Sequence, residues 1–317
     1  MTLTLALLVV AQAQAWQASV DSLAKLDQFT GVVVVAQNGV PQFERAYGMA
    51  DRDAGRANDL ETSFNIGSIN KLFTQIAIRQ LADAGKLDVD SSLARAWPDY
   101  PNQDLARKVT IRQILTMRSG IQGNIFAAPA GKTRHDVVSL QDFFDLIKNE
   151  PLQFEPGSKQ QYSNAGYIVL GLLIEKLSGE NYYEYVRRHI YEPAGMGQTG
   201  SWRVDRWPAN TALGYTKDSV GALSRNTDLL PGKGSSAGGG YSTAHDLLRL
   251  LNALREHKVT SAPEAGMVGI AGGAPGLNAA VEGGLPGGYD VIVLANLDPP
   301  AAERVAKLIR TSLVGTR

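Results

Sequence analysis

The chain contains no cysteine, and this absence excludes disulfides, thiol catalysis and thiolate metal sites together. Histidine is also scarce. The four histidines are widely spaced and place no metal-ligand pair on a shared helix face; they are His135, His189, His245 and His257. The sequence therefore predicts no metal site.

An excess of charge of either sign is missing as well. Lysine plus arginine (31) balances aspartate plus glutamate (31) over 317 residues. No basic field is available to attract nucleic acid or an acidic membrane surface. A hydrophobic content of 44% and a charged content of 20% are typical of a globular protein. This length allows one large domain or two smaller ones.

The first fifteen residues contain an apolar run that is too short to span a bilayer. Ala13-Gln14-Ala15 fits the small-x-small rule for signal-peptide cleavage before Trp16. Residues 1–15 are therefore predicted to be a signal peptide of an exported, periplasmic or secreted protein. No lysine or arginine precedes the apolar run, which leaves a buried N-terminal helix of a cytoplasmic protein as the alternative.

Both ends of the sequence predict β-strands. Residues 31–37 are β-branched and run into Asn38-Gly39, the strongest short hairpin signal, and residues 40–47 form the returning strand. Three more strands, separated by glycine and proline turns, are expected at 269–273, 277–282 and 289–296. A helix follows at 301–313. The two ends should therefore build one antiparallel sheet flanked by helices.

The middle of the sequence predicts helices with long polar connections. They are expected at 109–117, 140–148, 166–178 and 182–189. The fold class is thus α/β in the α+β sense, with an antiparallel sheet and a mainly helical inserted domain. We expect the sheet domain to comprise residues 16–85 and 240–317, and the helical domain residues 86–239. A cleft between two such domains is the usual place for a small-molecule site.

Ser68 and Lys71 form a Ser-x-x-Lys pattern where a turn becomes a helix. At helical pitch the two side chains share one face, so the amine can reach the hydroxyl. A serine becomes a nucleophile only when a nearby base takes its proton, and Lys71 is a candidate for that base. The helix start also offers free backbone N–H groups to a developing oxyanion. Because Ser22-x-x-Lys25 matches too, the pattern alone leaves open a helix N-cap followed by a surface lysine.

Tyr162 and Asn164 form a second candidate pair, in a loop before the apolar helix at 166–178. A loop tyrosine at a domain junction can act as a base if neighbouring cations lower its pKa. An asparagine two residues later can point its amide into the same cleft. Tyr100-Pro101-Asn102 also matches, so a half-buried structural tyrosine is the alternative.

The order of these motifs, together with a glycine-rich strand near the C-terminus, resembles one family. The chain resembles the serine β-lactamase and penicillin-binding protein superfamily, and within it the class C β-lactamase-like esterases and D-amino-acid peptidases. The resemblance extends from about residue 31 to residue 296. It includes three further stretches, Leu115 to Ile121, Phe154 to Gly157 and Ala237 to Thr243.

The third motif of that family, Lys-Thr-Gly or His-x-Gly, corresponds to residues 269–276 here. Ile270 stands where the family has a cation that faces a substrate carboxylate. By resemblance, Ile270 and Gly272 border the substrate, and the N–H of Gly273 is the second oxyanion donor beside that of Ser68. The segment before this strand is short for the family, which allows for one strand fewer.

The resemblance implies a serine hydrolase that forms an acyl-enzyme on Ser68 and uses no cofactor. Lys71 and Tyr162 would share the role of base, Tyr162 would activate water for deacylation, and Asn164 would orient the substrate or Lys71. The expected partner is a small ester, amide or peptidoglycan-like substrate rather than a nucleic acid.

Ile270 favours esters, or amides without a free carboxylate. Two alternatives remain. One is a β-lactamase or D-Ala-D-Ala carboxypeptidase with a cation supplied by Lys233 or Arg304. The other is a non-catalytic homologue that binds peptidoglycan or a partner. The sequence leaves the oligomeric state open.

Overall fold

The computed structural model describes residues 15–259 and 268–315. The predicted signal peptide lies almost entirely outside these ranges, and so does most of the short segment before the third motif. No helix in the described ranges is long and apolar enough to cross a membrane.

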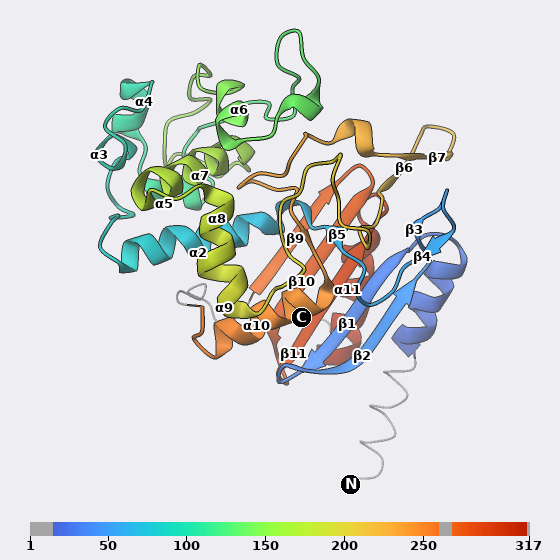
Figure 1. Ribbon diagram of the computed structural model, residues 1–317. Helices are drawn as coiled ribbons and strands as arrows, with labels where there is room; N and C mark the ends of the chain where they lie inside the picture. The colour runs from blue at the N-terminus through green and yellow to red at the C-terminus, as the bar shows by residue number, and fades with distance from the viewer. Residues whose placement is uncertain (1–14, 260–267, 316–317) are drawn as a thin grey trace.

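A five-stranded antiparallel sheet forms the centre of the fold (Figure 1). Its strands come from both ends of the chain, in the spatial order β2-β1-β11-β10-β9. They are β1 (Gly31–Gln37), β2 (Val40–Tyr47), β9 (Val268–Ala274), β10 (Leu277–Leu285) and β11 (Tyr289–Ala295). The predicted antiparallel sheet is confirmed.

Strand β1 is buried on both faces, which explains its unbroken apolar sequence. Val32 and Val34 belong to the larger hydrophobic core, whereas Val33 and Val35 belong to a second core behind the sheet. Successive side chains of a strand point to opposite faces, so one run of valines serves both cores. In register with β11, Val33 lies opposite Val293.

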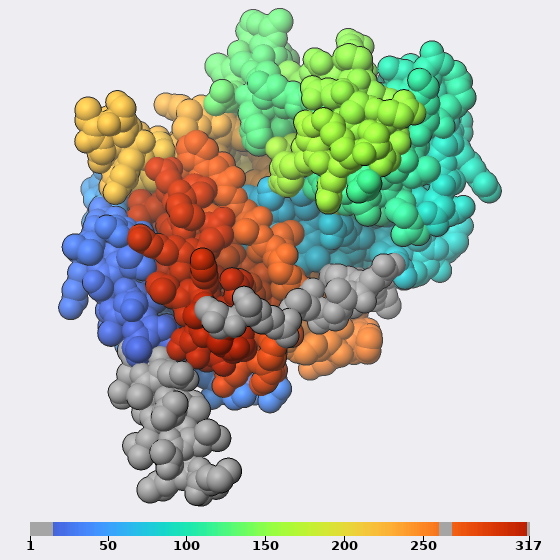
Figure 2. Space-filling view, turned by 180° about the vertical axis from the view of Figure 1, so that it is seen from behind, coloured from blue at the N-terminus to red at the C-terminus, as the bar shows by residue number. Residues whose placement is uncertain are grey.

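Helices cover both faces of the sheet. Helix α11 (Ala301–Val314) and the N-terminal helix at residues 15–25 pack on the second core. Seen from behind, α11 and the C-terminal strands occupy the middle of the molecule, with the N-terminal residues beside them (Figure 2). Helices α2 (Asn70–Asp83) and α10 (Ala244–Arg255) contribute to the larger core on the other face.

The connection between α2 and α10 is mainly helical. It contains α3 (Leu93–Ala96), α4 (Gln103–Lys108), α5 (Ile111–Leu115), α6 (Leu140–Asp145), α7 (Asn164–Ser178), α8 (Tyr182–Val186) and α9 (Glu192–Ala194). A π-helical turn, Arg187–Tyr191, joins the last two. Helix α7 is buried along nearly its whole length and packs against α2. The exact domain boundaries stay a prediction.

Short elements complete the fold around the site. The strand pairs are β3 (Met49–Asp51) with β4 (Arg56–Ala57), β5 (Phe64–Asn65) with β8 (Tyr241–Ser242), and β6 (Tyr215–Lys217) with β7 (Leu223–Arg225). The 3-10 turns are η1 (Gly67–Ile69), η2 (Arg134–Asp136) and η4 (Thr227–Leu229). Because β5 pairs with β8, η1 and the segment before α10 lie side by side.

Candidate active site

Ser68 lies in the turn η1, between strand β5 and helix α2. The turn begins at Gly67, whose φ of +50° favours glycine. The Gly67 N–H donates to the Oδ1 of Asn65 at 3.0 Å, which closes the turn before the serine. A side chain at Gly67 would also crowd the backbone nitrogen of Gly273, 3.1 Å from its Cβ position. The glycine at position 67 therefore allows the turn that carries Ser68 to lie close to strand β9.

Lys71 lies in the first turn of α2 and is buried, with 3% of its surface exposed. Its Nζ donates to Ser68 Oγ at 3.2 Å, to Asn164 Oδ1 at 2.8 Å and to the carbonyl oxygen of Ala237. The alternative of a solvated surface lysine is therefore wrong. Among the described residues no carboxylate forms an ion pair with it. Burial disfavours the charged ammonium and lowers the pKa of Lys71 to about 7.

Tyr162 completes the cluster from the loop before α7. Its hydroxyl lies 2.5 Å from Ser68 Oγ, and Lys71 Nζ lies 4.7 Å from the centre of its ring. Burial raises the pKa of Tyr162, and the hydrogen bond to Ser68 only partly opposes this effect. The condition under which Tyr162 could act as a base, a pKa lowered by nearby cations, is therefore not met. The phenol is protonated at neutral pH.

Asn164 is the first residue of α7. The preceding residue, Ser163, caps this helix by accepting the N–H of Gly166 at 2.9 Å. Its hydroxyl also donates to the carbonyl oxygen of Ile121 at 2.5 Å, which ties the helix start to the neighbouring loop. The Asn164 amide is thereby held where its oxygen accepts from Lys71. Asn164 was expected to orient either the substrate or Lys71, and this contact agrees with the second role.

Strand β9 approaches Ser68 closely because of its glycines. A Cβ at Gly272 would collide with the carbonyl oxygen of Ile66 and lie 2.8 Å from the Ser68 nitrogen. Gly273 borders the same cavity as Ser68. The two backbone N–H groups expected to bind an oxyanion therefore come from adjoining segments.

Ile270 lies elsewhere. It is half-buried, packs against the larger core and borders a separate hollow together with Lys307. It is not among the described residues that line the cavity at Ser68. The sequence placed it beside the substrate by resemblance, and the structure does not bring it there.

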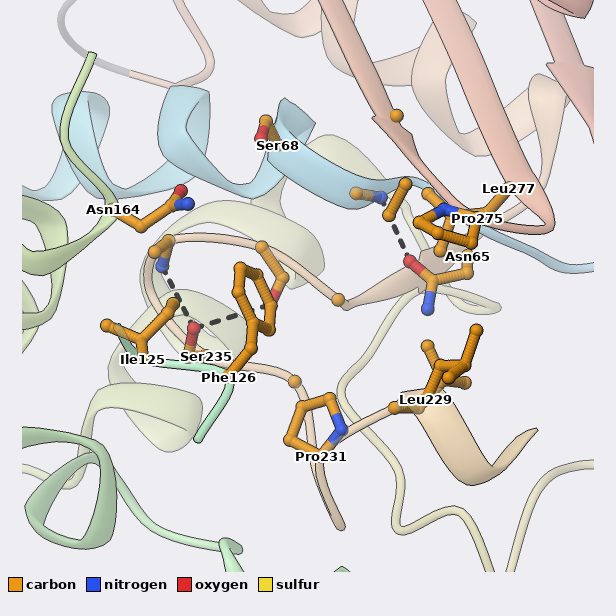
Figure 3. Close-up of a pocket in the computed structure, with 18 of the residues that line it drawn as sticks. Asn65, Ser68, Ile125, Phe126, Asn164, Leu229, Pro231, Ser235, Pro275 and Leu277 are labelled. Atoms are coloured by element: carbon orange, nitrogen blue, oxygen red, sulfur yellow. Dashed lines mark hydrogen bonds between the residues drawn. The ribbon is translucent and has the colours of Figure 1, made fainter. Parts of the chain in front are cut away.

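A cavity of about 940 Å³ opens at Ser68, Tyr162 and Asn164. Figure 3 shows Ser68 and Asn164 at one edge of it, with other labelled side chains across from them. Its wall is mostly apolar and includes Ile125, Phe126, Trp202, Leu229, Pro231 and Leu277. The charged side chains that border it in the described part of the chain are Arg134, Asp298 and Glu303.

The two cations proposed from the sequence do not reach this cavity. Lys233 Nζ lies 3.5 Å from the centre of the Tyr183 ring, and Arg304 donates to Gln28 at 3.1 Å and borders a different hollow. Sequence reasoning instead missed Arg134. The residue lies in a long connection without periodic pattern, so no local signal points to it.

Sequence reasoning also left the role of Ala237 open. The stretch Ala237 to Thr243 was recognised by resemblance, and the carbonyl oxygen of Ala237 accepts a hydrogen bond from Lys71.

The neighbouring residues 234–238 fit a Gly-x-Ser-x-Gly string. Ser236 is nevertheless fully buried and donates to the carbonyl oxygen of Tyr167 at 2.8 Å, so it is a structural serine.

Comparison with known proteins agrees with this geometry. Residues 17–304 match the β-lactamase family model. The chain belongs to the β-lactamase family. Penicillin-binding protein 4* of Bacillus subtilis (strain 168) is 31% identical over 207 residues, which cover 62% of this chain and 44% of that protein. The chain spans about half the length of the curated relatives it matches.

Solved structures of β-lactamase-like proteins extend the comparison to nearly the whole chain. A penicillin-binding protein from Bacillus halodurans has a TM-score of 0.81 at 29% identity, covering 96% of this chain and 98% of that one. EstCE1, described as a hydrolase with promiscuous acyltransferase activity, has a TM-score of 0.76 at 20% identity and covers 97% and 99%. The second likeness shows the fold alone. The family and the fold expected from the sequence are thus confirmed, and they support a serine hydrolase.

Proposed function

We propose that the protein hydrolyses esters or amides through an acyl-enzyme formed on Ser68. The observation that carries the proposal is the position of the Ser68 hydroxyl between two proton carriers. Its Oγ lies 2.5 Å from the Tyr162 hydroxyl and 3.2 Å from Lys71 Nζ. A nucleophile in direct contact with its base is the arrangement that covalent acyl transfer requires.

The difference between the two pKa values separates the roles of Lys71 and Tyr162. Lys71, with a pKa of about 7, is partly neutral near pH 7 and accepts the Ser68 proton as Oγ attacks the carbonyl carbon. Tyr162 stays protonated, so its hydroxyl donates a proton to the leaving group as the scissile bond breaks. Water then takes the place of the leaving group, and the same steps run in reverse to release the acid.

The negative charge that develops on the carbonyl oxygen needs donors. We assign this role to the backbone N–H groups of Ser68 and Gly273. Ser68 lies at the entrance to α2, where backbone N–H groups and the positive end of the helix dipole favour an anion. Gly272 lets strand β9 approach Ser68 closely enough for such a pair.

The mostly apolar wall of the cavity supports esters or amides without the carboxylate that the family's third motif binds. β-Lactams and D-Ala-D-Ala peptides carry a carboxylate that the family binds with a third-motif cation, whereas strand β9 of this chain has no charged residue. A carboxylate without that partner loses hydration and gains no charged hydrogen bond there. The two penicillin-binding relatives favour the alternative, a β-lactamase or D-Ala-D-Ala carboxypeptidase.

A panel of three substrates tests the proposal. The purified protein is given p-nitrophenyl butyrate, a chromogenic cephalosporin and a labelled penicillin side by side, with Ser68→Ala as the matched control. We expect the ester to have the highest kcat/KM and a fluorophosphonate label to map to Ser68. Faster hydrolysis of the cephalosporin contradicts the ester preference. A lasting penicillin adduct without turnover of any substrate indicates the non-catalytic binder instead.

We further propose that the protein is exported and cleaved before Trp16. The small-x-small sequence of residues 13–15 supports this cleavage point. Trp16 packs edge-on against Phe43, with ring centres 4.8 Å apart, and cleavage directly before it leaves this contact intact. N-terminal sequencing of the protein from fractionated cells tests the proposal, and an uncleaved N-terminus in the cytoplasm contradicts it.

A further inference from the structure

The charges that border the active-site cavity are unevenly placed. Asp298 and Glu303 lie at the side of α11, whereas Arg134 lies in the connection between α5 and α6. Arg134 is the one cationic side chain among the described residues that line the cavity. An anionic ligand in this space therefore meets attraction on one side and repulsion on the other.

Arg134 keeps its charge unneutralised. Within the described ranges its side chain makes one hydrogen bond, a long one from Nη1 to the carbonyl oxygen of Leu229 at 3.4 Å. No ion pair joins it to a carboxylate in the ranges that the structure covers. The nearest acid in sequence, Asp136, is already used, because its Oδ2 accepts from the N–H and the hydroxyl of Thr133 at 2.8 and 3.0 Å. Most donors of the Arg134 guanidinium are thus available to a ligand.

The acids on the other side are not available to neutralise Arg134. Asp298 accepts two backbone N–H groups, from Gly276 at 2.6 Å and from Lys217 at 2.8 Å. Glu303 stands in the first turn of α11, where the helix dipole favours its charge. Asp298 is held by these two bonds, and both carboxylates lie at the side of α11, where they disfavour an anion.

The surroundings of Arg134 strengthen a charged contact. Leu229, to whose carbonyl oxygen it donates, lies with Phe126 and Pro231 across the cavity from Ser68 (Figure 3). These apolar side chains offer a bound ligand few competing polar partners, and a guanidinium can hold a carboxylate with two parallel hydrogen bonds. The geometry differs from that of the family's third motif, because Arg134 and strand β9 belong to different walls.

We propose that Arg134 is a specificity-determining residue that binds a carboxylate of the substrate on the side of the cavity facing away from α11. The substrate class is then an ester or amide that carries an anionic group away from its scissile carbonyl. This inference rests on the proposed function for its catalytic step. Arg134 would supply, from another part of the chain, the cation that is missing at position 270.

Matched substrate pairs test the inference. In the first pair the acyl chain differs, with mono-p-nitrophenyl adipate against p-nitrophenyl hexanoate. In the second the leaving group differs, with 4-acetoxybenzoate against phenyl acetate. The measured quantity is the ratio of kcat/KM for the anionic over the neutral member. The wild type is compared with Arg134→Gln and Arg134→Lys, and Arg304→Gln serves as the control because Arg304 borders a different hollow.

We expect Arg134→Gln to lower the ratio by roughly tenfold to a hundredfold in at least one pair, the scale of a charged hydrogen bond. Arg134→Lys should retain part of the ratio, since it keeps the charge and loses the two-pronged geometry. Arg304→Gln should leave both ratios unchanged. Added salt should lower the wild-type ratio more than that of Arg134→Gln. Ratios that stay within twofold in both pairs after Arg134→Gln overturn the inference.

A binding measurement separates failure of this inference from failure of the proposed function. Boronic acids add to a nucleophilic serine without turnover, so 3-carboxyphenylboronic acid and phenylboronic acid are compared by calorimetry. Arg134→Gln should raise the Kd of 3-carboxyphenylboronic acid by roughly tenfold and leave the Kd of phenylboronic acid unchanged. If the wild type hydrolyses no ester but this selectivity holds, the proposed function fails and the inference stands. If the substitution weakens the binding of both compounds equally, or of neither, the inference is overturned.

Discussion

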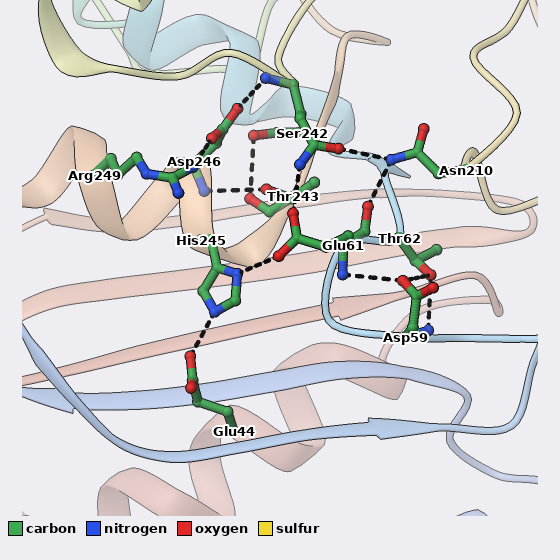
Figure 4. A network of polar contacts seen from close by, with 11 residues as sticks. Glu44, Asp59, Glu61, Thr62, Asn210, Ser242, Thr243, His245, Asp246 and Arg249 are labelled. Atoms are coloured by element: carbon green, nitrogen blue, oxygen red, sulfur yellow. Dashed lines mark hydrogen bonds and ion pairs between the residues drawn. The ribbon is translucent and has the colours of Figure 1, made fainter.

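Two buried polar clusters of this protein treat charge in opposite ways. Around Asp246, in the first turn of α10, each charge has a partner of opposite sign or several hydrogen bonds (Figure 4). The fully buried Asp246 carboxylate accepts from the Gln198 N–H at 2.7 Å, from the Thr199 hydroxyl at 2.8 Å and from Arg249 at 2.5 Å. The Lys71 amine, by contrast, donates to neutral acceptors alone among the described residues.

The difference shows what each cluster is built to do. Arg249 and two neutral donors hold the Asp246 carboxylate, and the cluster ties α10 to the segment before it. His245 adds to this tie, since its ring nitrogens lie 2.5 Å from Glu44 and 3.0 Å from Glu61. Lys71 is buried and has no carboxylate partner in the described part of the chain, so desolvation disfavours its charged form and lowers its pKa. A reactive amine and a structural charge are thus distinguished by their partners.

The largest expected effect is that of removing the nucleophile. Ser68→Ala should lower kcat/KM for p-nitrophenyl butyrate by at least about a thousandfold, because no other hydroxyl can form the acyl-enzyme. Steady-state kinetics with the purified variant measures this. Labelling by a fluorophosphonate should disappear as well. An adduct on another serine would contradict the assignment of Ser68.

The next effect concerns the two proton carriers. Lys71→Ala and Tyr162→Phe should each lower kcat/KM by roughly a hundredfold or more, since both contact the Ser68 hydroxyl. Groups that act as one unit are not additive, so the double variant should be within about tenfold of the poorer single variant. The four proteins are assayed on one ester. Fully multiplicative losses would show that the two residues act independently.

The structural cluster should respond in stability and not in chemistry. Asp246→Ala leaves the Gln198 N–H and the Thr199 hydroxyl without their acceptor, so it should lower the free energy of unfolding by about 1 to 3 kcal/mol. Urea denaturation measures this loss. Under conditions where the variant is folded, kcat/KM should stay within about threefold of the wild type. A large catalytic defect in folded protein would mean that the two clusters are coupled.

The smallest expected effect is at Ile270. Because this side chain packs toward the larger core and not into the cavity, Ile270→Ala should change kcat/KM for p-nitrophenyl butyrate and for a cephalosporin by less than about threefold. Both substrates are measured with the same enzyme preparation. A change above tenfold for either one would place Ile270 in contact with the substrate after all.

Much of the fold followed from sequence pattern. Strands β1 and β2 have the predicted bounds, because β-branched residues and the Asn38-Gly39 turn mark them unambiguously. Helix α6 ends at Asp145, three residues before its predicted end, since residues 146–148 form a looser turn. The meeting of Ser68, Lys71, Tyr162 and Asn164 was expected from motif order alone.

The parts that sequence could not give depend on burial and on contacts between distant segments. Sequence could not give the direction of the Tyr162 pKa shift, because the desolvation that raises this pKa is set by tertiary packing. Arg134 could not be found because its position at the cavity depends on its contact with Leu229, 95 residues away. The carbonyl oxygen of Ala237 reaches Lys71 across 166 residues, and a backbone acceptor leaves no side-chain signature.

The pH dependence of kcat/KM for a neutral p-nitrophenyl ester tests the central claim most directly, because kcat/KM reports ionisations of the free enzyme. Lys71 must be neutral to accept the Ser68 proton, so activity should be lost as pH falls through its lowered pKa. We predict a tenfold rise per pH unit below about pH 7 and a plateau above it. A profile that is flat from pH 5.5 to 9, or that rises only near the ordinary pKa of lysine, would contradict the account.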